Sequence, residues 1–419
     1  MAEHLRWREP CQVRKARAVE YPATAGWSSW ASGLKCRCTS LSACLQTGKI
    51  IGWSRRSDRP ALMLHSPNPS SAMPNKPYRA AIIGLGMIGG ADQVSGDALG
   101  QRVENLDGTH ANAYRGNPRI QLIAGASRDA GRRQRFAART GARTYPNWRD
   151  MIEGEALDIV SVATYAPQHA EITIACAGRR VPVVFCEKPV ATGLTDAGRM
   201  LEVCQQNKVL LVINHQRRFN LNYRRLQLAI AAGELGELVS AHLQWPTGRL
   251  GNVGTHALDA LLMLSRRRFK AVSATLDLAG KPDCRGGDFH DPGGWGTFRL
   301  EGGMMATVHA PDYGMMPFQI EINGAAGRAL VQGQKVTIEY GDGHIDHWPA
   351  PTDRISGMDR AVAEIVDYLD RQTPFPYAAE EAVHTLEAIL GFHASHSRKS
   401  AWTELPLSGN DRKIDVASG

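Results

Sequence analysis

From Tyr78 onward, short runs of apolar and β-branched residues alternate with longer segments whose apolar residues recur at helical spacing. The apolar runs predict buried strands at 78–83, 120–126, 157–163, 181–186 and 209–214. Helices are expected between them, at about 109–114, 147–153, 170–177 and 194–207. Because strands that alternate with helices pair in parallel, this half of the chain predicts an open parallel sheet with helices on both faces.

The second half of the chain has a different pattern, in which short strand-like segments are separated by turns that often contain glycine. These segments lie at 239–245, 272–278, 295–300, 305–310, 318–323 and 329–331, and they predict an antiparallel or mixed sheet. Residues 359–369 and 380–396 have helical spacing. We expect the first of these two helices to pack on the second sheet.

Three glycines follow the first predicted strand directly, in the sequence GLGMIG at 84–89. In a strand–turn–helix unit, the first glycine allows the tight turn, the second lets the backbone approach a pyrophosphate, and the third lets the helix pack closely. The amides at the start of the helix then face the phosphates. This context predicts a Rossmann dinucleotide-binding domain, with cofactor contacts at Gly84, Gly86, Met87, Ile88 and Gly89.

Ligands of open parallel sheets bind beyond the carboxyl ends of the strands. Residues at these ends, or in the turns after them, are therefore further candidates for cofactor contacts: Ser127, Arg128, Thr164, Pro167, His169, Glu187, Lys188 and Asn214. Arg128 would attract a 2′-phosphate, and for this reason we favour NADP over NAD. Alternatively, Arg128 is solvated, and Asp129 binds the ribose hydroxyls of NAD.

The net charge of +8 is confined to the N-terminal part of the chain. Residues 1–76 hold 12 of the 49 Lys and Arg residues and 4 of the 41 Asp and Glu residues, which leaves 37 of each sign in residues 77–419. A balanced folded part offers no basic face to nucleic acid. No run reaches the roughly 18 apolar residues of a membrane span. We expect a cytoplasmic protein without nucleic-acid or membrane partners, preceded by a poorly structured basic extension at 1–76.

Two other features carry weaker signals. Residues 91–108 interrupt the helix after the glycine motif, and we interpret this insertion as a surface loop rather than a lid. The cysteines and histidines lack the spacing of a metal site, so no metal is expected. The pairs His344 with His347 and His393 with His396 are expected to face solvent.

Five motifs together resemble the Gfo/Idh/MocA family of oxidoreductases. They are GLGMIG at 84–89, TYAPQH at 164–169, EKP at 187–189, NHQRRF at 214–219 and GNVGTHALD at 251–259. The resemblance extends from Tyr78 to Leu407. It implies an α/β fold with a Rossmann domain at 77–214, followed by an α+β domain at 215–419 with a large, open, mostly antiparallel sheet for substrate binding and oligomerisation. It also implies a homodimer or homotetramer.

The resemblance further implies two catalytic residues, Lys188 of the EKP motif and His256 of the GTH motif. An imidazole can take the proton of a substrate hydroxyl near neutral pH, and a lysine can donate a hydrogen bond to the developing alkoxide. The expected substrate-binding residues are His215, Arg218, Asn252 and His256. Arg217 is a candidate for the same role, although a surface ion pair is nearly as good an explanation for both arginines.

One position departs from the family pattern. Many members carry an aspartate four residues before the histidine, where this chain has Asn252. An amide contributes no negative charge, so we predict that His256 is less basic than in those members. Asp259 is interpreted as a helix residue rather than as a replacement for the missing carboxylate.

The sequence thus favours an NAD(P)-dependent oxidoreductase acting on a secondary hydroxyl of a sugar, sugar acid or cyclitol. Two other functions of the same fold stay open. One is a regulator that binds a dinucleotide and a sugar without turnover, and the other is an NAD-dependent glycosidase that regenerates its cofactor.

Overall fold

The computed structural model describes residues 76–94, 108–278, 289–312, 315–371 and 374–418. The extension predicted at 1–76 and the insertion at 91–108 therefore lie almost entirely outside the described residues. Among these residues, no helix is both long and apolar enough to cross a bilayer.

The first half of the described chain forms a six-stranded sheet in the order β3-β2-β1-β4-β5-β6, with every neighbouring pair parallel. This is the strand order of a doubly wound dinucleotide-binding sheet. Its strands are β1 (Tyr78–Ile83), β2 (Ile120–Ala126), β3 (Arg143–Tyr145), β4 (Ile159–Val162), β5 (Val183–Cys186) and β6 (Leu210–Ile213). The five predicted strands are confirmed, and the short β3 is an addition.

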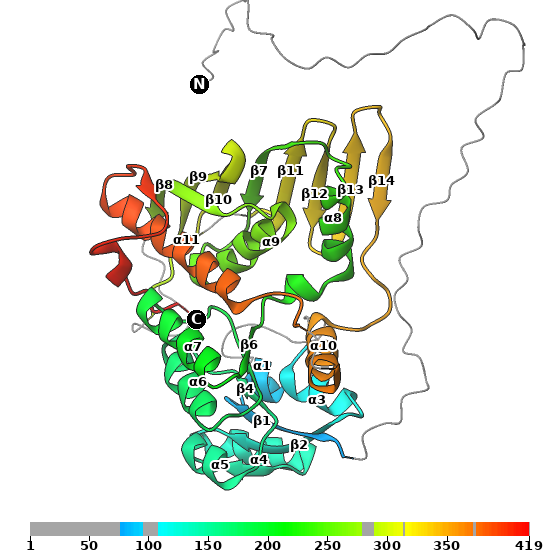
Figure 1. Ribbon diagram of the computed structural model, residues 1–419, viewed down its shortest axis with the longest axis vertical. Helices are drawn as coiled ribbons and strands as arrows, with labels where there is room; N and C mark the ends of the chain where they lie inside the picture. The colour runs from blue at the N-terminus through cyan, green and yellow to red at the C-terminus, as the bar shows by residue number, and fades with distance from the viewer. Residues whose placement is uncertain (1–75, 95–107, 279–288, 313–314, 372–373, 419) are drawn as a thin grey trace, which may run out of the picture. The chain divides into compact units, whose positions relative to one another are not determined.

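Helices cover both faces of this sheet (Figure 1). One hydrophobic cluster joins the sheet to residues of α5 (Trp148–Gly154), α6 (His169–Gly178) and α7 (Leu194–Gln206). A second cluster joins the other face to α3 (His110–Gly116), α4 (Ala130–Thr140) and α10 (Gly357–Arg371). The short α1 (Met87–Gly90) follows the glycine motif, and α4 was not predicted.

The position of α10 corrects the sequence-based expectation. We expected this helix to pack on the second sheet, but it lies beside α3 on the parallel sheet (Figure 1). Its apolar residues Met358, Ala361, Val362 and Ile365 are buried with residues of β1, β5 and β6. Helical spacing predicts an apolar stripe, but it does not say which of two sheets will bury that stripe.

The second half of the chain forms a nine-stranded sheet in the order β14-β13-β12-β11-β7-β10-β9-β8-β15. Neighbouring strands are antiparallel, except that β7 and β10 run parallel. The strands are β7 (Leu238–Gln244), β8 (Phe269–Asp277), β9 (Gly293–Leu300), β10 (Met305–Ala310), β11 (Gln319–Gly324), β12 (Gly327–Gln332), β13 (Lys335–Tyr340), β14 (Ile345–Trp348) and β15 (Thr403–Glu404). The predicted fold class is confirmed, although β13, β14 and β15 were not anticipated.

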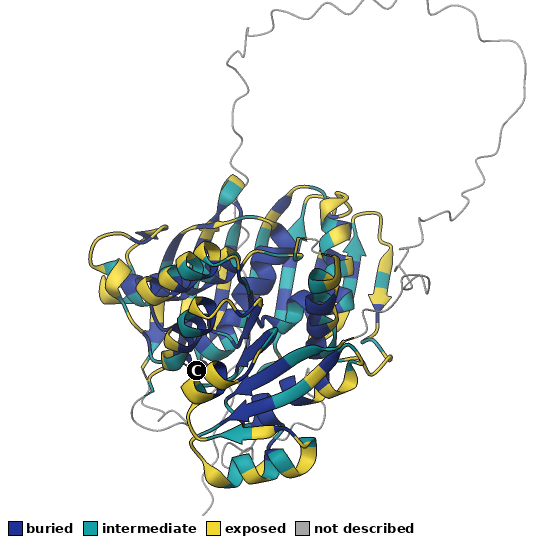
Figure 2. Ribbon diagram, turned by 60° about the horizontal axis from the view of Figure 1, so that its bottom comes forward, coloured by how far each residue is buried: buried dark blue, intermediate teal, exposed yellow. Residues whose placement is uncertain are grey.

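Three longer helices accompany the second sheet, and short helical turns mark the connections. The helices are α8 (Leu221–Ala231), α9 (Thr255–Ser265) and α11 (Ala379–Ser397). The turns are η1 (Ala166–Gln168), η2 (Gln216–Phe219), η3 (Leu250–Gly254, a π-helical turn), η4 (Glu301–Gly303) and η5 (Asp411–Lys413). The helix α11 packs on β8 and α9 and also touches α7 and β6 of the parallel sheet. One hydrophobic cluster is therefore continuous from one sheet to the other. Figure 2 shows the buried residues concentrated in the strands and the exposed ones on the outer helices and loops.

The placement of α10 predicts an unequal response at two isoleucines, one in the middle of the helix and one just before it. Ile365 is completely buried, whereas Ile355, just before the helix, is 51% exposed. Ile365→Ala should lower the free energy of unfolding by about 2–5 kcal/mol, because it leaves a cavity against the parallel sheet. Ile355→Ala should change it by less than about 0.5 kcal/mol. Urea denaturation followed by circular dichroism measures both, and equal effects would contradict the burial of α10.

Candidate active site

The carboxyl ends of the parallel strands open into a cleft of about 730 Å³. This volume lies within the range of small-molecule and cofactor sites. Residues from the second half of the chain close one end of the cleft, namely Gln216, Asn252 and His256. The sequence-predicted residues that line it are Gly84, Gly86, Met87, Ile88, Ser127, Arg128, Thr164, Glu187, Lys188, Asn252 and His256.

The glycine motif forms the floor of the cleft, and two of its glycines are required by the protein itself. Gly84 has φ +98°, and a Cβ there would lie 2.3 Å from the carbonyl oxygen of Ala163. A Cβ on Gly89 would lie 1.9 Å from the carbonyl oxygen of Gly84. By contrast, a Cβ on Gly86 would meet only an Arg132 nitrogen at 4.0 Å. Gly86 therefore borders open space, as expected for a backbone that a pyrophosphate approaches closely. The loop and the cleft volume fit a dinucleotide.

Arg128 and Arg132 line the cleft at the end of β2. Asp129, the acidic residue at this strand end, accepts a hydrogen bond from the Arg132 amide at 2.7 Å and so caps α4. This hydrogen bond holds the pKa of Asp129 below its usual value. One carboxylate oxygen of Asp129 thus binds the amino terminus of α4. The guanidinium groups of Arg128 and Arg132 lie at the same end of the cleft.

Lys188 lies directly after β5, at the start of a cis peptide bond to Pro189. Its Nζ donates to Asn252 Oδ1 at 3.2 Å and to the Asn252 carbonyl oxygen at 3.4 Å. Asn252 belongs to the π-helical turn η3, which leads into α9. The lysine of the parallel sheet and the turn that precedes the histidine therefore meet in one cleft.

The Asp291 carboxylate holds η3 in place from a third segment of the chain. Its two oxygens accept hydrogen bonds from the amides of Gly251 at 2.7 Å and Asn252 at 2.8 Å. Asp291 is only 6% exposed. Nothing in the local sequence pointed to this residue, because it lies some 40 positions from the turn that it supports.

Glu187 is the buried anion next to Lys188. Its Oε1 receives the Asn214 amide at 2.7 Å and contacts His110 Nε2 at 3.1 Å, while His110 Nδ1 bonds Ser161 at 2.7 Å. Burial alone would raise the pKa of Glu187, but the His110 hydrogen bond and charge, Lys188 and Asn214 together lower it to about 2. Glu187 is therefore a carboxylate at neutral pH, and it offsets the charge of Lys188.

His256 is partly buried at the end of the cleft. Its ring centroid lies 6.2 Å from that of His215, and its Nδ1 has no hydrogen-bond partner among the described residues. Desolvation, followed by the charges of Arg217, Lys188 and His215, holds the pKa of His256 well below its usual value. The imidazole is therefore neutral at pH 7.

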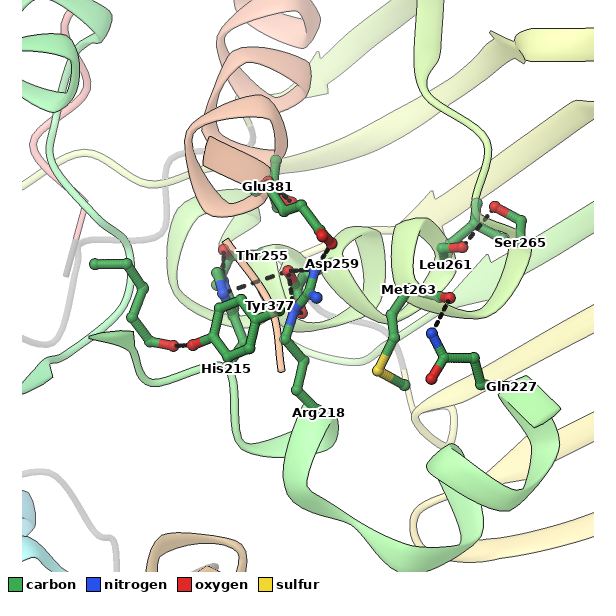
Figure 3. Close-up of polar contacts among 12 residues, drawn as sticks. His215, Arg218, Gln227, Thr255, Asp259, Leu261, Met263, Ser265, Tyr377 and Glu381 are labelled. Atoms are coloured by element: carbon green, nitrogen blue, oxygen red, sulfur yellow. Dashed lines mark hydrogen bonds and ion pairs between the residues drawn. The ribbon is translucent and has the colours of Figure 1, made fainter. Parts of the chain in front are cut away.

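Two predicted substrate-binding residues, His215 and Arg218, do not line the cleft. Arg218 forms a bidentate pair with Asp259 at 2.8 Å and bonds Glu381 at 2.7 Å, with its guanidinium 4.5 Å from the Tyr377 ring (Figure 3). His215 bonds Thr255 at 3.0 Å and lies 3.4 Å from Asp259. Asp259 is thus more than a helix residue, but its partners are Arg218 and His215, not His256.

Four predicted cofactor residues also do not line the cleft, for different reasons. Gly89 packs under Gly84, and Asn214 is completely buried beneath Glu187. His169 is buried and bonds the carbonyl oxygens of Thr164 and Pro189, so it braces two strand ends. Pro167 is exposed in the turn η1.

Several lining residues were not singled out from the sequence: Arg132, Trp148, Tyr165, Gln168 and Glu171. Most belong to the unpredicted α4 or to segments after strand ends, so the strand-end rule would have found Tyr165 and Gln168. Elsewhere, His393 corrects an expectation, because it is largely buried and burial lowers its pKa to about 4. No group of three metal-ligating side chains occurs within the part of the chain that the structure describes.

A family model described as an oxidoreductase family with an NAD-binding Rossmann fold matches residues 78–215. Inositol 2-dehydrogenase 3 of Saccharopolyspora erythraea is 32% identical over 167 residues, which are 39% of this chain and 44% of that protein. An inositol 2-dehydrogenase of Salmonella paratyphi B is 28% identical over 210 residues, which are 46% of this chain and 56% of that protein. The matched region spans about half the length of these curated relatives.

Solved structures match a larger part of the chain. An inositol dehydrogenase homolog from Azotobacter vinelandii, complexed with NADH and myo-inositol, aligns with a TM-score of 0.66 at 19% identity and covers 79% of this chain and 98% of that one. A levoglucosan dehydrogenase in complex with NADH and levoglucosan aligns with a TM-score of 0.66 at 17% identity and covers 79% and 100%. At such identities the likeness establishes the fold.

The support of η3 by Asp291 predicts a positioning role that can be separated from stability. Asp291→Asn replaces one acceptor oxygen with an amide and should displace Asn252 and Lys188, which lowers kcat about tenfold with little change in cofactor affinity. Asp158→Asn is the matched control, because Asp158 also accepts a backbone amide, from Arg79 at 2.8 Å, but at the amino-terminal edge of the sheet. If both variants lose stability alike and keep full kcat, Asp291 has no role in positioning.

Proposed function

We propose that this chain, whose residues 78–215 belong to the Gfo/Idh/MocA oxidoreductase family, transfers hydride between a nicotinamide dinucleotide and a secondary hydroxyl of a sugar, sugar acid or cyclitol. The observation that carries the proposal is the meeting of Lys188 and the His256 turn in one cleft floored by the glycine motif. The inositol 2-dehydrogenases named above support the class of reaction.

The cofactor would lie along the carboxyl ends of the strands. Gly84 and Gly86 would approach its pyrophosphate, Ser127 and Arg128 its adenosine ribose, and Thr164 and Lys188 its nicotinamide end. When bound, the nicotinamide supplies the hydride chemistry, and the protein supplies alignment and charge.

Residues of this chain would accept the proton that the reaction releases. Oxidation of a CH–OH group releases a proton from oxygen, and the neutral His256 imidazole can accept it. Lys188 donates a hydrogen bond to the oxygen as negative charge develops there, and the enclosed cleft strengthens this bond. Asn252 accepts hydrogen bonds from the lysine ammonium and so orients it, and the negative charge of Glu187 attracts it.

Replacement of Lys188 or His256 should strongly lower the turnover rate, while the affinity for the cofactor is retained. Lys188→Met and His256→Ala should each lower kcat/KM by at least about a hundredfold, because each removes a group that acts on the reacting oxygen. Absorbance of the reduced nicotinamide, recorded with a panel of sugars, sugar acids and cyclitols, gives the rate, and nucleotide fluorescence gives the affinity. Lys270→Met, which removes a surface lysine paired with Glu301, is the control.

The same panel separates the rival functions. A regulator would bind the dinucleotide tightly and turn over nothing, whereas a glycosidase would release sugar without net cofactor reduction. Either result would replace the oxidoreductase proposal.

We further propose that NADP is preferred over NAD. Arg128 and Arg132 offer two cations where a 2′-phosphate would lie, while Asp129 is engaged at the terminus of α4. A guanidinium pairs with a phosphate through two parallel hydrogen bonds. The structures named above hold NADH, and they support only the nicotinamide dinucleotide itself.

Arg128→Ser should therefore change the preference between the two cofactors. The ratio of kcat/KM for NADP to that for NAD should fall about tenfold or more, because one charge-assisted contact to the 2′-phosphate is lost. Since both cofactors are measured on one variant, a general loss of activity cancels from the ratio. An unchanged ratio would place the 2′-hydroxyl away from Arg128.

The division of the chain is part of this proposal. Residues 77–214 would bind the cofactor, and residues 215–419 would bind the substrate and form a homodimer or homotetramer, with α10 returning to the parallel sheet. A cytoplasmic location fits such an enzyme.

A further inference from the structure

Three buried polar side chains of the parallel-sheet half lead to Glu187, and the proposed mechanism uses none of them. Tyr114 Oη lies 2.6 Å from Ser161 Oγ, which lies 2.7 Å from His110 Nδ1. His110 Nε2 in turn lies 3.1 Å from Glu187 Oε1. The first three side chains are completely buried, whereas Glu187 lines the cleft directly before Lys188. A continuous chain of hydrogen bonds therefore joins the core to the cleft.

The chemistry of these groups places a hydrogen on one nitrogen of His110. Glu187 is ionised at neutral pH, and an ionised carboxylate only accepts hydrogen bonds. His110 Nε2 must therefore carry a hydrogen and donate it to Glu187. The Ser161 hydroxyl bonds the other ring nitrogen. The imidazole is thus held at both of its nitrogens.

The imidazole of His110 is also fixed by its packing. The Phe185 ring lies edge-on to it, with the two ring centroids 4.7 Å apart. His110 is the first residue of α3, and the Thr109 side chain caps this helix by accepting a hydrogen bond from the Asn112 amide at 3.3 Å. Because both the backbone and the ring are held, the Nε2 hydrogen of His110 points in one direction, toward the carboxylate.

The Glu187 carboxylate is held from more than one element. Its Oε1 also accepts a hydrogen bond from Asn214 Nδ2 at 2.7 Å, and the backbone amide of Glu187 donates to the Val162 carbonyl oxygen at 2.8 Å. Hydrogen bonds to an ionised group are stronger than those between neutral groups. The next residue, Lys188, donates to Asn252 Oδ1 at 3.2 Å. The carboxylate is thus fixed by the core, and the adjacent ammonium by the turn η3.

We infer that His110 is a positioning residue for the proposed reaction, and that it acts by holding the Glu187 carboxylate in place as the counter-charge of Lys188. The inference rests on the proposed function, in which Lys188 donates a hydrogen bond to the reacting oxygen. A carboxylate that turned away would leave the ammonium without the negative charge of its neighbour. Charges that are oriented in advance stabilise a transition state most, because nothing has to reorient during the reaction.

Two replacements of His110 separate the hydrogen bond from the packing. His110→Phe keeps a ring against Phe185 but has no N–H, whereas His110→Gln loses the ring but places an amide donor near the position of Nε2. With the panel compound that the wild-type protein oxidises best, kcat should fall about tenfold or more in His110→Phe, as expected for one lost charge-assisted hydrogen bond. His110→Gln should stay within about threefold of the wild type. If His110→Phe is as active as His110→Gln or more so, only the packing of the ring matters and the inference is wrong.

A double-variant cycle tests whether His110 acts through Glu187. Glu187→Gln removes the counter-charge itself, and it should lower kcat by at least as much as His110→Phe does. The protein with both changes should be no slower than Glu187→Gln alone, because residues that act as one unit are not additive. Losses that multiply would show that His110 acts by another route.

The matched control is His384→Phe. His384 is also a buried histidine next to a buried glutamate, with its Nδ1 3.6 Å from Glu387 and its Nε2 accepting the Phe269 amide at 3.0 Å. It belongs to α11 and does not line the cleft. Its replacement should lower the melting temperature, as His110→Phe does, but leave kcat unchanged. Equal losses of kcat in the two variants would show that any buried histidine has this effect.

A measurement on the wild-type protein without substrate or cofactor is independent of turnover. In the spectrum of full-length protein labelled with ring-¹⁵N histidine, the signal of His110 is identified by its loss in His110→Gln. Its Nε2 should carry a proton that exchanges slowly with water, because the ring is completely buried. The resonance of this proton should move in Glu187→Gln.

The outcomes separate this inference from the function on which it rests. A His110 Nε2 without a proton, a resonance that Glu187→Gln leaves unchanged, or losses that multiply in the double variant overturn the role of His110 and leave the oxidoreductase standing. Absence of turnover on every compound of the panel, with the Nε2 proton in place, overturns the proposed function itself.

Discussion

A hydrogen bond between Lys188 and Asn252 joins the two halves of the candidate site. The lysine ends a strand of the parallel sheet, and the asparagine belongs to the π-helical turn that leads into α9. Their 3.2 Å contact brings the ammonium group into the same cleft as His256. Asp291 fixes the turn from a third segment through two backbone amides. The chemistry of the cleft therefore depends on the packing of the two sheets against each other.

That packing is stabilised by apolar burial and by one buried ionic cluster. The helix α11 contacts the antiparallel sheet on one side and α7 and β6 on the other, so one hydrophobic cluster spans both halves. Arg218, Asp259 and Glu381 join η2, α9 and α11 at the same place. Arg218 and Asp259 are buried, and each of these charges is paired, as buried charges must be.

Charge is distributed unevenly along the cleft. At the end of β5, the ionised Glu187 balances Lys188, and His110 and Asn214 complete its hydrogen bonds. At the other end, His256 stands among Arg217, Lys188 and His215. Desolvation and these neighbours lower the pKa of His256, so the imidazole stays neutral at pH 7.

The sequence alone determined the α/β class, the strands of the parallel sheet, the glycine turn and the strand ends at which Lys188 and Thr164 emerge. These features follow from local periodicity and from the rule that parallel strands end at a common edge, so they need no knowledge of distant contacts. The tertiary structure decided which polar residues of the motifs face the cleft. Arg218 and His215 contact Asp259, and His169 contacts two backbone carbonyl oxygens. These partners lie close to one another only in the folded chain. It also decided the sheet on which α10 packs and the role of Asp291. The sequence shows that an apolar stripe must be buried and that a carboxylate must be paired. Contacts between residues far apart in the chain decide which partner each of them has.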